Sequence, residues 1–72
     1  MKFENIENQQ VFYVNKTITL KGSAGTEVDV VSLKIDGNAF DETEVSKDGE
    51  FTFEFVFSDI RSSVSLELVG FD

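Results

Sequence analysis

Hydrophobic and polar residues alternate with a period of two in the second half of the chain. Four phenylalanines share one parity: Phe51, Phe53, Phe55 and Phe57. The residues that alternate with them at 50, 52 and 54 are polar. Because successive side chains of a β-strand point to opposite faces, this stripe predicts a strand with one buried face and one wet face. We interpret the stripe as core packing rather than as an adhesive surface.

Two further segments show the same alternation. Ile18 and Leu20 alternate with threonine and lysine, and Leu66 and Leu68 alternate with serine and glutamate. Strands of this kind bury one face and expose the other, which is typical of antiparallel sheets.

Turn-forming residues separate these segments. Asp36-Gly37 and Asp48-Gly49 give the strongest hairpin signals, because glycine adopts a positive φ without steric cost. Together the signals predict seven short strands, at residues 3–6, 10–14, 17–22, 28–35, 39–46, 50–57 and 63–69. Seven strands at this spacing are typical of an antiparallel β-sandwich or a small barrel.

One predicted strand, at residues 28–35, breaks the alternation. Val28 and Val30 share one parity, whereas Val31 and the two apolar residues after it share the other. A regular strand cannot bury both sets on one face. Either a β-bulge lies near Val30 and Val31, or the strand begins at Val31 and the two earlier valines belong to the preceding turn.

The segment 41–44 (Asp-Glu-Thr-Glu) suits a strand at the edge of a sheet. Exposed edges are commonly protected by proline or charge, and this chain contains no proline. We expect the negative charge of this segment to discourage pairing with another sheet.

Composition narrows the possible functions. Seventy-two residues make a single domain, at residues 1–72, and the chain lacks both cysteine and histidine. Disulfides, thiolate metal sites and the commonest general base are therefore absent. Seven serines have no histidine beside them, and so short a chain leaves little room for a substrate cleft between paired carboxylates. We expect no enzyme activity and no cofactor.

The chain is strongly acidic, with a formal net charge of −8. This charge repels phosphate backbones and anionic membrane surfaces, so no nucleic-acid partner is expected. No apolar run approaches the roughly 20 residues of a membrane-spanning helix, so no membrane insertion is expected either. The first residues lack the apolar stretch of a signal peptide, so Met1 begins either an intracellular protein or a part excised from a longer one.

One acidic cluster has the oxygen ligands that calcium prefers. Asp36, Asn38, Asp41 and Glu42 lie near a predicted turn, but Phe40 stands where an EF-hand loop would need a third ligand. We interpret Asp36 and Asn38 as turn formers, and no metal site is predicted.

The order of these motifs resembles a known group of modules. The chain reads Thr-Ile-Thr-Leu-Lys-Gly at 17–22, an apolar strand ending in Asp-Gly-Asn at 31–38, Lys-Asp-Gly-Glu-Phe-Thr-Phe at 47–53, and a last strand that ends at Asp72. This layout resembles the bacterial Ig-like and fibronectin-III-like repeats of surface proteins, including accessory modules of cell-envelope proteases. The resemblance covers residues 17–72 and implies an all-β, immunoglobulin-like antiparallel sandwich.

Such modules commonly continue past an aspartate like Asp72 into one more strand. If the chain ends there, the sheet that holds the strand at 63–69 exposes an edge, which the N-terminal segment or another chain could fill. If the chain is a fragment, that strand lies beyond the boundary.

The resemblance implies a non-catalytic spacer or interaction module of a larger bacterial surface or secreted protein. Its partners would be neighbouring domains of the same chain, and its state a monomer or an edge-strand dimer. Two alternatives stay open: a module that binds carbohydrate or protein, and a small structural subunit that completes its sheet with another chain. The aromatic residues whose burial the pattern leaves open are the possible ligand or interface residues, Phe12, Tyr13, Phe40 and Phe71.

Overall fold

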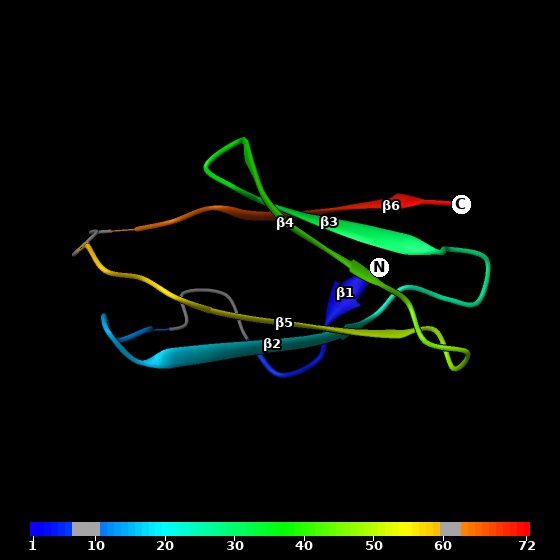
Figure 1. The fold of residues 1–72 in the computed structure, drawn as a ribbon, viewed down its shortest axis with the longest axis horizontal. Helices are drawn as coiled ribbons and strands as arrows, with labels where there is room; N and C mark the ends of the chain where they lie inside the picture. The colour runs from blue at the N-terminus through cyan, green and yellow to red at the C-terminus, as the bar shows by residue number, and fades with distance from the viewer. Residues whose placement is uncertain (7–10, 60–62) are drawn as a thin grey trace.

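The computed structural model describes residues 1–6, 11–59 and 63–72, and every regular element in those ranges is a β-strand (Figure 1). The strands are β1 (Lys2–Phe3), β2 (Thr17–Ser23), β3 (Val30–Ile35), β4 (Asn38–Glu44), β5 (Glu50–Val56) and β6 (Leu66–Phe71). All the strand pairs are antiparallel. The predicted all-β, antiparallel class is therefore confirmed.

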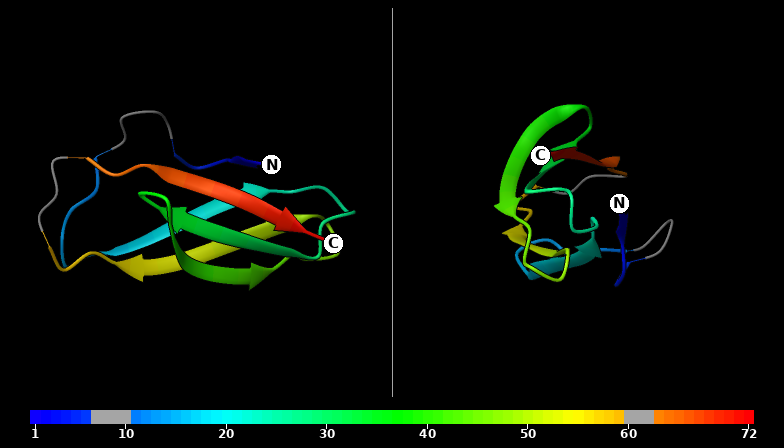
Figure 2. Two further views of the ribbon diagram at one scale, coloured as in Figure 1. Left: turned by 90° about the horizontal axis from the view of Figure 1, so that it is seen from above. Right: turned by 90° about the vertical axis from the view of Figure 1, so that its right-hand side faces the viewer.

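The strands form two small sheets. One has the order β1-β2-β5 and the other the order β4-β3-β6. The sheets lie as two layers facing each other (Figure 1). β1 and β6 lie on one side of the molecule, and β4 and β5 on the other (Figure 2, left). One open side between the layers is thus bordered by β1 and β6, and the other by β4 and β5.

The core lies between the sheets and contains residues from both. Its buried members are Ile18, Leu20, Phe51 and Phe53 from one sheet, and Val31, Leu33 and Ile35 from the other. The alternation read from the sequence explains this directly, since β5 buries Phe51 and Phe53 and exposes Glu50, Thr52 and Glu54. Phe55 and Phe57 share the same parity and are half-buried. The stripe is core packing, as predicted.

The two predicted hairpin signals have different outcomes. Asp36 and Gly37 have φ angles of 52° and 84° and join β3 to β4, whose closing pair is Ile35 with Asn38. This hairpin is confirmed. Asp48-Gly49 also forms a turn, but the turn carries the chain from one sheet to the other, because β5 pairs with β2. The hairpin predicted at Asp48-Gly49 is therefore wrong, and the phenylalanine strand β5 lies at the end of its sheet.

The irregularity predicted in β3 takes another form. β3 begins at Val30, and the register with β4 shifts between Leu33 and Lys34, which leaves Phe40 of β4 unpaired. Leu33 pairs with Asp41 on one side of the shift. At the start of β3, Val30 pairs with Phe71 of β6. The N–H of Asp29 also donates to the carbonyl oxygen of Phe71 (2.8 Å). Val30 therefore lies in the strand but off the core face, where it is half-buried.

The N-terminal strands differ from the prediction. The strand expected at 3–6 is the two-residue β1, and residues 11–14 of the strand expected at 10–14 are not in a sheet. Residue 10 lies outside the described residues. The segment 10–14 has apolar residues at four successive positions, so it has β propensity without the alternation that fixes a face.

Candidate functional site

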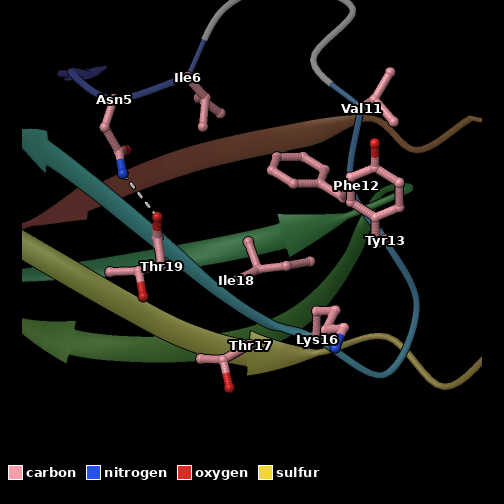
Figure 3. A pocket seen from close by; sticks show the side chains of 9 residues that line it. All are labelled: Asn5, Ile6, Val11, Phe12, Tyr13, Lys16, Thr17, Ile18 and Thr19. Atoms are coloured by element: carbon pink, nitrogen blue, oxygen red, sulfur yellow. Dashed lines mark hydrogen bonds between the residues drawn. The ribbon is translucent and has the colours of Figure 1, made fainter.

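A small pocket opens beside β2, between the N-terminal segment and the residues that precede β2 (Figure 3). It has a volume of about 240 Å³, just below the roughly 300–1,000 Å³ of most ligand pockets. The described residues that line it are Asn5, Ile6, Val11, Phe12, Tyr13, Lys16, Thr17, Ile18 and Thr19.

The side chain of Asn5 holds one wall of this pocket against β2. Its Nδ2 donates to the carbonyl oxygen of Thr19 (2.8 Å), and its Oδ1 accepts from the N–H of Lys21 (2.7 Å). The backbone N–H of Glu4 also donates to the carbonyl of Lys21 (2.7 Å). The amide group of Asn5 thus continues the bonding to the backbone of β2 beyond the end of β1. This explains why β1 can be so short and still be anchored.

The apolar floor and the rim come from different residues. Ile18 is a buried core residue, and Ile6 and Phe12 are half-buried against the core. Val11 and Tyr13 are 68% and 72% exposed. Adjacent residues therefore have opposite roles, since Phe12 packs inward and Tyr13 stands at the rim (Figure 3).

The four aromatic residues singled out in the sequence do not form one site. Phe12 and Tyr13 both line the pocket, but the other two do not belong to its lining. Phe40 is 46% exposed at the bulge of β4, where its ring lies 5.0 Å from that of Phe55. Phe71 is 51% exposed and pairs with the first residue of β3, at the other end of that strand from the bulge. Phe40 and Phe71 thus lie at different places on the sheet.

The described lining of the pocket offers groups that can hydrogen-bond and stack. They include the phenol of Tyr13, the ammonium of Lys16 and two threonine hydroxyls, with no carboxylate among them. The described residues hold no group of three or more potential metal ligands. Within the same ranges, every buried side-chain nitrogen or oxygen atom has a hydrogen-bond partner. A hydroxyl, an ammonium and an exposed ring can hydrogen-bond and stack against a polar ligand.

Sequence reasoning missed the polar part of this site. Asn5 was read as one residue of a predicted strand, and Lys16 as part of a turn. The turn is present, since Asn15 has a φ of 59°. A polar asparagine at a strand end is the one signal that could have indicated a side-chain cap of the neighbouring strand.

Comparison with known proteins gave no match to any family model, curated protein or solved structure. In the described part of the chain, no helix is long and apolar enough to cross a membrane.

Proposed function

We propose that the chain is a non-catalytic, immunoglobulin-like interaction module of a larger surface or secreted protein. The observation that carries this proposal is the strand order β1-β2-β5 and β4-β3-β6. Immunoglobulin-like sandwiches place strands A, B and E in one sheet and strands C, F and G in the other, with C′ added beside C in some members.

The strands correspond to this plan in chain order. β1, β2 and β5 take the places of A, B and E, and β4, β3 and β6 those of C′, C and F. The turn at Asp48-Gly49 is then the connection that crosses between the sheets before E. The place of strand G, beside β6, has no strand among the described residues.

The surface chemistry supports an interaction role over a catalytic one. The pocket holds no acid–base pair among its described residues, and the chain has no histidine. The net charge of −8 keeps such a module soluble and favours partners with basic groups.

The gene context tests the proposal. We expect the DNA on either side of the coding segment to encode a secretion signal and further modules rich in short strands. A reading frame that stops directly after Asp72 and has no secretion signal would overturn the surface assignment. Amide NOEs that join β2 to β5 and β3 to β6 are the expected solution test of the strand order.

The exposed ring beside the pocket favours a second candidate function, the binding of a small polar ligand such as a sugar. Tyr13 is 72% exposed, and the polar residues Lys16 and Thr17 line the same pocket. An exposed aromatic face with hydrogen-bonding groups around it is suited to stacking and orienting a sugar ring.

Tyr13→Ala is expected to abolish any glycan binding detected on an array and to leave stability within about 0.5 kcal/mol, because the ring is mostly exposed. Tyr13→Phe keeps the ring and removes only the hydroxyl, so it should retain part of the binding. Equal binding by all three proteins would exclude the pocket as the glycan site.

A further inference from the structure

Four strands lie at the ends of the two sheets, and three of them are protected against pairing with another chain. β1 has only two residues, and the side chain of Asn5 continues its contacts with β2. β4 has the register shift at Phe40 and three acidic residues nearby. β5 faces β4 across one open side of the molecule, where the ring centroids of Phe40 and Phe55 lie 5.0 Å apart. Short strands, bulges, charges and covering segments are the usual protections of sheet edges.

Among the described residues, β6 has neither a bulge nor a second strand paired along its open edge. It pairs with β3 in an unbroken register from Leu66 to Phe71, and Glu67 is its only charged residue. The N-terminal segment pairs with β2 and not with β6, so it does not fill this edge as the sequence suggested it could. Met1 lies against the inner face of β6, where its Sδ is 3.0 Å from the position a Cβ on Gly70 would take.

The register shows which backbone groups face the open edge. Ser65 accepts a hydrogen bond from the N–H of Asp36 (2.8 Å), so its backbone points toward β3. Backbone direction alternates along a strand, and therefore the N–H and C=O groups of Leu66, Leu68 and Gly70 point away from β3. These groups form a row of donors and acceptors that only an extended backbone can match.

The side chains beside the edge are also incompletely covered. Leu66 and Leu68 point into the core but stay half-buried, whereas their partners on β3, Ile35 and Leu33, are 6% and 0% exposed. A strand added beside β6 would cover both leucines with the residues that it turns inward.

We propose that the edge of β6 binds an extended segment of another polypeptide, in which apolar residues alternate with basic ones. The backbone groups of β6 specify a strand, and the half-buried leucines specify apolar residues on its inner face. Glu67 is exposed on the outer face and, with the net charge of −8, specifies lysine or arginine there. A second copy of this chain is a poorer occupant, because it brings the same excess of acidic groups. The proposal rests on the interaction-module function and names the partner's chemistry.

The test uses the 72-residue chain, labelled with ¹⁵N, and a synthetic peptide that alternates valine and lysine. Before the peptide is added, the amides of Leu66, Leu68 and Gly70 should exchange with solvent faster than those of Glu67 and Val69, which face β3. The peptide should slow the exchange of the first three amides in a saturable way. The same peptide with N-methyl groups on alternate residues, facing β6, should have no effect, because it lacks the amide hydrogens that pair with the edge.

A charge reversal on the outer face tests the choice of a basic strand. Glu67→Lys should weaken peptide binding about threefold to tenfold, as expected when a favourable cross-strand charge pair becomes a like-charge pair. Glu54→Lys is the matched control, because Glu54 is also exposed on a strand but lies on the other sheet, and it should change the affinity by less than twofold.

Three results would overturn the proposal. The amides that face the edge could stay unprotected at saturating peptide, or both charge reversals could weaken binding equally. Alternatively, those amides could be protected in the chain alone with a dimer in sedimentation, which would mean that a second copy occupies the edge. A strand order different from the one described would refute the proposed function itself, and NOEs from the same sample distinguish that failure from these.

Discussion

Phe53→Ala should lower the free energy of unfolding by about 3–5 kcal/mol, the cost usually measured for truncating a buried phenylalanine. Phe53 is 1% exposed and is the largest fully buried side chain of the described core. It pairs with Leu20 across the sheet, and its ring lies 5.8 Å from that of Phe51 in an edge-to-face arrangement. Urea denaturation followed by far-ultraviolet circular dichroism measures the loss.

The loss is large compared with what a chain of 72 residues can have. Domains are stabilised by about 0.05–0.15 kcal/mol per residue, which gives about 4–11 kcal/mol here. Phe71→Ala is the matched control, since it deletes the same ring at a site that is 51% exposed, and it should cost less than half as much. Equal losses for the two variants would mean that the stripe of β5 is not the core.

The local pattern was sufficient to predict the strands that have one apolar face and one polar face. Leu20, Val31 and Phe53 are buried as their parity indicated, and the hairpin at Asp36-Gly37 forms as its residues indicated. In each case the signal lies within a few neighbouring residues. Side-chain alternation and a positive φ are local properties, so a single segment contains all the information.

Pairing between distant segments could not be read in this way. Asp48-Gly49 has the sequence of a hairpin turn, yet the strand after it pairs with β2, roughly 30 residues earlier in the chain. The partner of β5 depends on which sheet offers a matching apolar face. Both sheets offer one, so the local sequence does not decide between them. Phe40 is likewise unpaired because the register of β4 against β3 shifts there, and its ring packs against Phe55. Neither feature is encoded by the neighbours of Phe40 in sequence.

The candidate site was less predictable than the fold for the same reason. Phe12 and Tyr13 were identified as aromatic residues of uncertain burial, and the pocket includes both. Its polar wall depends on Asn5, whose side chain reaches β2 across 14 residues of sequence at Thr19 and 16 at Lys21. The open edge of β6 was considered from the resemblance, and the acidic edge strand at 41–44 was predicted from its charge, but the protection of the β1 and β5 edges became apparent only from the sheet order.

Gly22→Ala should destabilise the protein by about 1–3 kcal/mol or more, as expected for a core that is forced to accommodate an extra methyl group. A Cβ at this position would collide with the ring of Phe51 and with the carbonyl oxygen of Lys2. The ring of Phe51 is itself held in place, since it is 3% exposed and packs near Phe3. A carbonyl oxygen of β1 can move only if β1 separates from β2. Thermal unfolding measures the loss.

The sign of this effect distinguishes a packing constraint from a general glycine effect. Gly22 does not have a positive φ, and replacing such a glycine by alanine would otherwise stabilise a protein by about 0.4–1 kcal/mol through the unfolded state. Gly70→Ala is the matched control, because its closest side-chain neighbours include the flexible Met1, and it should cost clearly less. In Gly22→Ala, the amide of Glu4 should also lose protection from exchange, because its bond to the carbonyl of Lys21 (2.7 Å) depends on the pairing of β1. Stabilisation by Gly22→Ala, or an intact β1 in that variant, would show that the ring of Phe51 does not pack over this glycine.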